Sequence, residues 1–274
     1  MPLKVACIQS NSGSDVAANI AALKPLVERA AQTNATLVAL PENTFRMEAP
    51  GERGPYPSEE DHEGVKAASR WAQAFDIWLL VGSAAVLPTP DASLPVNRSL
   101  LFNPQGEVAA RYDKLHLFDV TLSSGERYAE SAKFTRGEKP TLAVTPFGGL
   151  GMTICYDVRF PALYRTLAKA GAAILAVPSA FTHATGSAHW HVLLRARAIE
   201  NGCFVIAPAQ AGMHPGGRRT FGHSLIVNPW GEVLAEGSES EPGVIAAELD
   251  LSEVERARGQ IPSLKHGDNM TYKM

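Results

Sequence analysis

The 274-residue sequence predicts an α/β fold in which layers of β-sheet are covered by helices. Short apolar runs alternate with amphipathic stretches along the chain, and the apolar runs are continuous rather than alternating. Continuous apolarity is typical of strands that are buried on both faces. Because no linker-like change in composition divides the chain, we expect a single domain spanning residues 1–274.

In the first half, apolar runs predict strands at residues 4–9, 36–40 and 78–86, and amphipathic spacing predicts helices at 15–31 and 62–74. Asp15 is positioned to cap the first helix, and Pro41 ends the second strand. Residues 98–102 and 107–112 form a predicted hairpin. The intervening turn has proline to fix one φ angle and glycine to supply a positive one.

In the second half, the predicted strands are residues 149–154, 172–177, 203–207, 225–227 and 244–249, and the predicted helices are 161–170 and 188–200. Gly171 is the predicted stop of the first of these helices. The sequence NPWGEV at 228–233 repeats NPQGEV at 103–108, which favours two similar halves but also fits chance turn usage. Residues 214–219 (HPGGRR) are a predicted flexible, basic loop, and the polar tail from about residue 265 is predicted to cover the surface or a partner.

Composition and charge exclude several classes of protein. With 25 basic and 28 acidic residues, the formal net charge is −3, which argues against a nucleic-acid partner. No apolar run reaches the ~18 residues of a membrane span, and the N-terminus has no signal-peptide pattern. Three widely spaced cysteines do not form a disulfide framework, so we expect a reducing, cytoplasmic compartment.

Cys155 is the sharpest candidate for chemistry. It lies between the predicted strand 149–154 and the helix that begins near Pro161. A tight strand-to-helix turn exposes a side chain and leaves backbone N–H groups free to bind an oxyanion. The alternative is that Cys155 is a small buried hydrophobe, which is the interpretation we favour for Cys7 and Cys203.

A cysteine nucleophile needs a base to take its proton and a positive or donor group to stabilise the oxyanion. Three charged residues are of the types that supply these functions. Glu42 follows the buried strand 36–40, where open α/β folds place ligands, although it could equally be a helix cap or a surface acid. Lys114 follows the hairpin, and Glu130 lies further on; on local pattern alone both are solvated charges.

Histidines are poor candidates for the base or for a metal site. His189 and His191 are two positions apart on a predicted helix and cannot share a face, which disfavours joint metal ligation with His183. We therefore expect no metal and no cofactor.

Three segments together resemble the signatures of the nitrilase superfamily of carbon–nitrogen hydrolases: LPEN at 40–43, YDKLHLFD at 112–119 and GMTICYDVRFP at 151–161. They occur in the family's order and with similar spacing, and the resemblance covers nearly the whole chain. It implies a four-layer α-β-β-α sandwich that forms a homodimer, or a higher homo-oligomer, through its helices, with the tail from about residue 265 at that interface.

The resemblance also implies roles for individual residues. Glu42 is the general base, Lys114 the electrostatic stabiliser and Cys155 the nucleophile, with the Tyr156 backbone N–H as an oxyanion donor. Glu130 matches the second glutamate of the family, which holds the lysine; Glu126 is a nearby competitor for that place.

The residues after the cysteine, YDVRFP, are similar to the amidase group that includes deaminated glutathione amidase and omega-amidase. The expected activity is hydrolysis of a small, carboxylate-bearing amide such as deaminated glutathione through a Cys thioester. Alternatives are an omega-amidase acting on 2-oxoglutaramate, a broad aliphatic amidase or nitrilase, and a non-catalytic interaction protein. The presence of Glu42, Lys114 and Cys155 disfavours the last of these. The candidate substrate-binding residues are Arg159, Phe181, Thr185, Arg218 and Arg219, although ion pairing or a solvated loop would equally explain the arginines.

Overall fold

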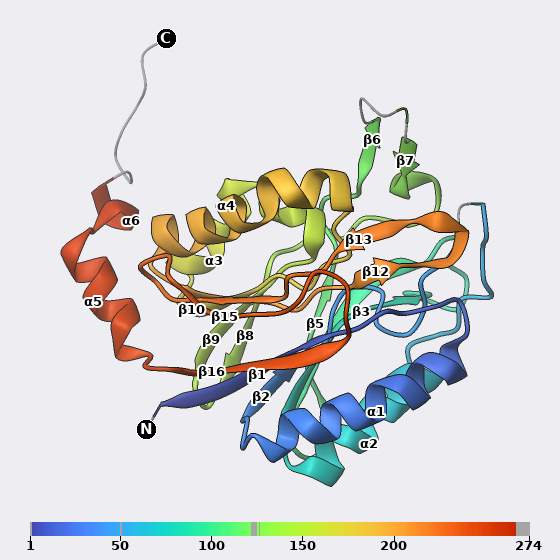
Figure 1. The fold of residues 1–274 in the computed structure, drawn as a ribbon, viewed down its shortest axis with the longest axis horizontal. Helices are drawn as coiled ribbons and strands as arrows, with labels where there is room; N and C mark the ends of the chain where they lie inside the picture. The colour runs from blue at the N-terminus through green and yellow to red at the C-terminus, as the bar shows by residue number, and fades with distance from the viewer. Residues whose placement is uncertain (1, 50, 122–124, 126, 267–274) are drawn as a thin grey trace.

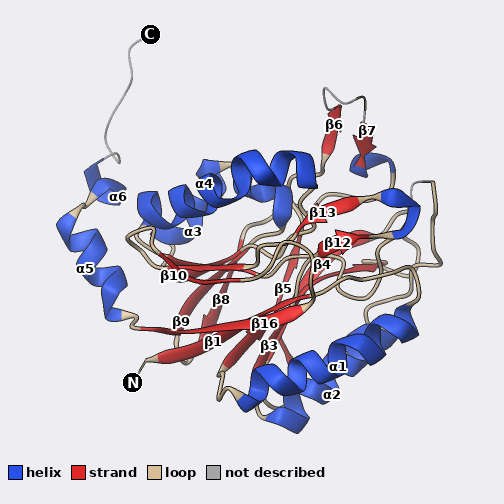
Figure 2. Cartoon of the chain, in the orientation of Figure 1, coloured by secondary structure: helices blue, strands red, loops and turns tan. Residues whose placement is uncertain are grey.

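The computed structural model describes residues 2–49, 51–121, 125 and 127–266, and in it two six-stranded sheets lie face to face between pairs of helices (Figure 1). The first sheet has the order β16-β1-β2-β3-β4-β5 and the second β15-β14-β11-β10-β9-β8. This is the predicted four-layer α-β-β-α sandwich, and Figure 2 shows its helices on the two outer sides.

The first sheet and its helices are β1 (Leu3–Gln9), α1 (Val16–Gln32), β2 (Leu37–Ala39), α2 (Glu63–Phe75), β3 (Trp78–Val86), β4 (Val96–Phe102), β5 (Val108–Asp113) and β16 (Gly243–Leu249). The second sheet and its helices are β8 (Thr141–Thr145), β9 (Gly148–Met152), α3 (Pro161–Lys169), β10 (Ala172–Ala176), α4 (His183–Asn201), β11 (Phe204–Ala207), β14 (Leu225–Val227) and β15 (Val233–Glu236). Two short hairpins, β6 (Asp119–Thr121) with β7 (Arg127–Ala129) and β12 (Ala211–Met213) with β13 (Arg219–Phe221), and the helices α5 (Ser252–Gln260) and α6 (Ser263–His266) complete the described chain.

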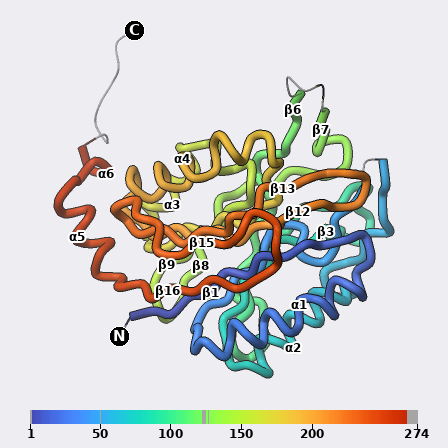
Figure 3. Tube along the Cα trace, in the orientation of Figure 1, coloured from blue at the N-terminus to red at the C-terminus, as the bar shows by residue number. Residues whose placement is uncertain are grey.

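The two halves of the chain repeat one strand plan. In each, three parallel strands are followed by two antiparallel ones: β1-β2-β3 then β4-β5, and β9-β10-β11 then β14-β15. The repeated turn is also identical in its bonds, because Asn103 and Asn228 each accept from the glutamate N–H four residues on at 2.9 Å. The trace in Figure 3 shows the blue-to-cyan helices α1 and α2 on one side and the yellow-to-orange α3 and α4 on the other.

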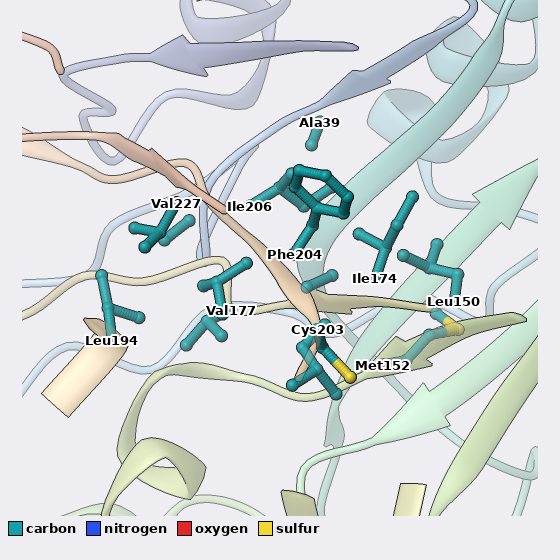
Figure 4. Close-up of a cluster of buried hydrophobic side chains, with 14 of the residues drawn as sticks. Ala39, Leu150, Met152, Ile174, Val177, Leu194, Cys203, Phe204, Ile206 and Val227 are labelled. Carbon is teal, nitrogen blue, oxygen red and sulfur yellow. The ribbon is translucent and has the colours of Figure 1, made fainter. Parts of the chain in front are cut away.

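The core follows from the alternation of side chains along fully buried strands. In β1, Ala6 and Ile8 face α1 and α2, whereas Val5 and Cys7 face the second sheet. Cys203 lies fully buried in the core of the second half, in the cluster of apolar side chains that Figure 4 shows. The interpretation of Cys7 and Cys203 as packing residues agrees with this burial.

The structure differs from the sequence-based expectation at the start of α4 and at residues 214–219, among other places. Helix α4 begins at His183 rather than residue 188, because Gly186 allows the helix to pack against Phe221, where a Cβ would lie 2.4 Å from the Phe221 Cβ. Residues 214–219 were expected to be a loop; in the structure they form a 3₁₀ turn, Pro215–Gly217, and Arg219 begins strand β13.

None of the described helices has both the length and the apolar composition that a membrane crossing requires. The predicted tail from about residue 265 lies outside the described residues beyond His266, as does Glu126.

Candidate active site

Four of the predicted site residues meet in one cavity of about 1000 Å³. Glu42 follows β2, Lys114 follows β5, Cys155 follows β9, and Glu130 begins the 3₁₀ turn Glu130–Ala132. The cavity therefore lies where strands of both sheets end, and each sheet contributes part of its lining.

Cys155 occupies a strained turn at the end of β9. Its φ is +47°, a left-handed conformation that non-glycine residues seldom adopt, and its N–H donates to the Pro178 carbonyl at 3.0 Å. The 3₁₀ turn Cys155–Arg159 starts here, and within the described residues no backbone carbonyl outside that turn accepts from the Tyr156 N–H. Cys155 is 8% exposed, so the predicted strand-to-helix turn is present but places the thiol in a buried wall of the cavity, and the role of the Tyr156 N–H as oxyanion donor stays a prediction.

Glu42 is a buried carboxylate with both oxygens occupied. Oε1 accepts from Lys114 Nζ at 2.8 Å and Oε2 accepts from the Ala180 N–H at 2.8 Å. Burial raises the pKa of Glu42, but the Lys114 ammonium outweighs burial and holds the pKa below its ordinary value. The carboxylate is therefore ionised and able to accept a proton.

Lys114 lies between two carboxylates. Its Nζ is 2.8 Å from Glu42 Oε1 and 2.9 Å from Glu130 Oε2, and its side chain is 2% exposed. Burial lowers the pKa of Lys114, but Glu130 and Glu42 raise it well above its ordinary value. Glu130 is itself fixed by the Phe118 N–H, which donates to its Oε2 at 2.6 Å.

The thiol of Cys155 is held in its protonated form. Burial and then the Glu42 charge raise the pKa of Cys155, and Lys114 and the Ala180 N–H only partly offset them. The resting site therefore holds a neutral thiol next to an ionised carboxylate, and this thiol becomes a thiolate only by giving its proton to a base.

Asn97 is a site residue that the sequence reasoning missed. Its Nδ2 donates to Glu42 Oε1 at 3.1 Å and to Glu130 Oε1 at 3.2 Å, while its Oδ1 is buried without a partner. A neutral amide thus holds two carboxylates that repel each other. The sequence signal that could have identified Asn97 was its polar amide directly after Val96, the first residue of β4 (VNRSLLF).

Asp157 is a second missed residue, and it connects the lysine segment to the cysteine turn. Its fully buried carboxylate accepts from the Ile154 N–H at 2.8 Å, from the Tyr112 hydroxyl at 2.7 Å and from the His116 N–H at 3.1 Å. The His116 ring is stacked on Phe160 with centroids 3.6 Å apart. The sequence signal for Asp157 was that the motifs YDKLH and CYDVRF occur together, because Tyr112 and His116 of the first motif contact Asp157 of the second.

The predicted substrate-binding residues separate into two groups. Phe181, Thr185, Arg218 and Arg219 line the cavity, whereas Arg159 is not among its lining residues. Instead, the Arg159 guanidinium lies 5.2 Å from the Phe181 ring centroid and contacts His189. Arg159 thus packs behind the cavity wall.

Arg218 and Arg219 differ in their partners. Arg219 forms an ion pair with Glu239 at 2.5 Å at the exposed rim. Arg218 lies 5.6 Å from the Tyr128 ring centroid and donates to the Ala180 carbonyl at 2.7 Å, and no acidic side chain of the described chain pairs with it. Its Nε is buried and has no partner. Arg218 is therefore a cation with unused hydrogen-bonding capacity in the same cavity as Glu42, Lys114 and Cys155.

The three histidines considered for a metal site have separate partners. His183 contacts Glu239, His189 contacts Arg159, and His191 contacts Glu236. They do not converge on one point, in agreement with their spacing along α4.

Residues 4–259 match the carbon–nitrogen hydrolase family. Deaminated glutathione amidase of Synechocystis sp. is 41% identical over 267 residues, which cover 97% of this chain and 98% of that protein.

Two solved structures are also similar. The Caenorhabditis elegans NitFhit protein has a TM-score of 0.89 and 38% identity, covering 99% of this chain and 66% of its own. Saccharomyces cerevisiae Nit3, a member of branch 10 of the nitrilase superfamily, has a TM-score of 0.85 and 33% identity, covering 95% of this chain and 94% of its own.

Proposed function

The chain belongs to the carbon–nitrogen hydrolase family and is an amidase, and we propose that Cys155, Glu42, Lys114 and Glu130 carry out its reaction without a metal or a cofactor. The observation that carries this proposal is the contact of Glu42 with Lys114 at 2.8 Å in a buried site beside the Cys155 thiol.

In the first step, Glu42 takes the proton of the Cys155 thiol as the sulfur attacks the amide carbon. The carbon–oxygen double bond opens, and its oxygen gains negative charge. The Lys114 ammonium and the Tyr156 N–H stabilise that oxyanion; one such donor is worth about 2.7–4 kcal/mol. Glu42 then returns the proton to the leaving nitrogen, the carbon–nitrogen bond breaks, and a thioester remains on Cys155.

In the second step, Glu42 takes a proton from water as the water oxygen attacks the thioester. The carbon–sulfur bond breaks, the acid leaves, and the proton returns to sulfur. Glu130 and Asn97 keep Lys114 and Glu42 in place throughout, because both contact the same carboxylate–ammonium cluster. Glu42 serves in both steps, so its loss stops both.

For the substrate, we propose a small amide that carries a carboxylate, such as deaminated glutathione. A cavity of about 1000 Å³ is at the upper end of small-molecule sites and has room for a leaving group larger than ammonia. Arg218, which has no acidic partner among the described residues, is the preferred anchor for the carboxylate, with Phe181 and Thr185 as further lining.

A substrate panel tests this function. Deaminated glutathione, 2-oxoglutaramate, aliphatic amides and nitriles are compared by kcat/KM, with and without a chelator or a thiol-alkylating reagent. The proposal expects the highest kcat/KM for deaminated glutathione, inhibition by the alkylating reagent and no inhibition by the chelator. A higher kcat/KM for 2-oxoglutaramate would make it an omega-amidase. Absence of release from every amide would favour a binding protein.

We further propose that residues 1–274 act as one catalytic domain and form a cytoplasmic homodimer through α4. Val192 and Ile199, seven residues apart on this helix, are 67% and 52% exposed. Trp230, which precedes the Gly231 that packs against Ile199, is 52% exposed. Large apolar side chains grouped on one face are typical of an interface. Light scattering of Val192→Glu should show monomers if this face is the interface; an unchanged dimer would contradict it.

A further inference from the structure

Three side chains outside the active site direct ligand atoms to one point. His191 lies on α4, His223 follows β13, and Glu236 ends β15. His191 Nε2 is 3.0 Å and His223 Nδ1 is 2.6 Å from the same oxygen, Oε1 of Glu236. One ligand atom from each of the three residues lies within 4.8 Å of the others. Residues that lie up to 45 positions apart in the sequence thus form one cluster.

The backbone holds this cluster in place. His223 has a φ of +51°, its N–H donates to the Ser238 carbonyl at 2.9 Å, and its carbonyl accepts from the buried Trp190 indole at 2.7 Å. Gly222 makes this path possible, because a Cβ there would lie 2.2 Å from the Glu239 carbonyl oxygen. The His223 ring is therefore positioned before any ligand arrives.

The chemistry of the three ligands fits a divalent transition metal. Imidazole nitrogen and carboxylate oxygen are ligands of Zn²⁺, and two histidines with one glutamate form a known three-ligand set that leaves a fourth position for water. The side chains of His191, His223 and Glu236 are 35%, 23% and 39% exposed, so solvent reaches that position. The neighbouring side chains of Arg219 and His183 contact Glu239 instead.

We propose that His191, His223 and Glu236 form a surface binding site for one Zn²⁺-like ion. Such an ion lies about 2.0–2.2 Å from each ligand atom, so tetrahedral ligand atoms lie about 3.3–3.6 Å apart. The two contacts with Glu236 Oε1, now 3.0 Å and 2.6 Å, therefore have to lengthen by about 1 Å or less. Bound metal joins α4 to the β13–β14 connection and to β15. It takes no part in the proposed amide chemistry, because none of its ligands lines the active-site cavity.

Calorimetric titration with zinc chloride tests the site. The protein is the full chain without an affinity tag, dialysed against a chelator, and it carries Cys155→Ser so that the active-site thiol does not bind the metal. The site predicts one equivalent of Zn²⁺ and a melting temperature that rises with Zn²⁺. His191→Gln and Glu236→Gln should each weaken binding about tenfold or more and abolish the rise in melting temperature.

His189→Gln is the matched control, because His189 lies on the same helix two positions away and contacts Arg159 instead. It should keep full Zn²⁺ affinity. The visible spectrum of bound Co²⁺ gives an independent measurement on the same variants. Absence of binding to the Cys155→Ser protein, or equal affinity in His191→Gln and His189→Gln, would overturn the proposal.

Discussion

The Nζ atom of Lys114 lies 2.8 Å from Oε1 of Glu42, so the proposed oxyanion stabiliser and the proposed base form one buried ion pair. Both residues follow strands of the first sheet, β2 and β5, and each fixes the charge of the other: the lysine keeps the base ionised, and the base keeps the lysine charged. Removing either partner of a buried pair leaves an uncompensated charge.

Lys114→Ala should lower kcat by about 10²–10³-fold or more, because a charged donor to the oxyanion is lost and Glu42 loses its partner. Lys114→Arg should not restore kcat, since a planar guanidinium does not replace a compact ammonium between two carboxylates. Steady-state kinetics measure this, with thermal unfolding to show that the variants are folded. A near-normal kcat in Lys114→Ala would remove the lysine from the mechanism.

Asn97→Ala should shift the acid limb of the kcat/KM profile to higher pH. The wild-type limb should fall below pH 4.5, because the pKa of Glu42 lies below its ordinary value and the base is lost only as pH drops through that lowered pKa. Loss of the Asn97 donor raises the pKa of Glu42, so protonation begins at higher pH.

Ser99→Ala is the control for Asn97→Ala. Ser99 is buried on the same strand and donates to the Val81 carbonyl at 3.0 Å, without contact to either carboxylate. It should lower stability without moving the acid limb. An equal shift in both variants would mean that Asn97 acts only through the fold.

Arg218→Gln should raise KM for a carboxylate-bearing amide about ten- to hundredfold, because a hydrogen bond to a charged group is worth about 1.5–3 kcal/mol. Arg219→Gln should raise it much less, since Glu239 already pairs with that guanidinium. KM for a simple aliphatic amide serves as the reference and should change little. A larger effect at Arg219, or equal effects on both substrates, would assign the carboxylate elsewhere.

The elements that the sequence predicted well are those with long patterns. β3 extends over Trp78–Val86 as expected because nine largely buried residues form one apolar run, and α1 has an Asp15 cap that bonds the Ala18 N–H. Strands β6, β7, β12 and β13 have three residues each and were missed. Strand β14 is as short but was predicted, because all its residues are apolar and buried, whereas each of the missed strands contains an exposed residue, and a polar residue or a glycine interrupts its apolar run.

The sequence likewise predicts only part of the candidate site. Motif order brings Glu42, Lys114 and Cys155 together, but the partners of a side chain depend on distant chain segments. Arg218 and Arg219 are neighbours in sequence, but Arg219 pairs with Glu239 whereas Arg218 contacts Tyr128 and the Ala180 carbonyl, and these partners are distant in the chain. Asn97 likewise acquires its importance from two carboxylates that lie 33 and 55 residues away.

Cys155 and Cys203 are both buried, but only Cys155 is proposed to react. Cys203→Ala should cost about 1 kcal/mol of unfolding free energy and leave kcat unchanged, because its sulfur is buried in the core and donates to the Ala172 carbonyl. Cys155→Ala should abolish turnover and leave the fold intact. Turnover and chemical unfolding of the two variants, measured side by side, check this; substantial turnover in Cys155→Ala would contradict it.

The most direct measurement is peptide mass spectrometry of enzyme quenched during turnover of an amide. The account predicts a mass increase equal to the acyl group on the peptide that contains Cys155, removed by hydroxylamine as a thioester would be, and absent from the Cys155→Ala protein. An acyl group on any other residue, or turnover without an adduct under conditions where thioester hydrolysis is rate-limiting, would contradict the assignment of Cys155 as the nucleophile.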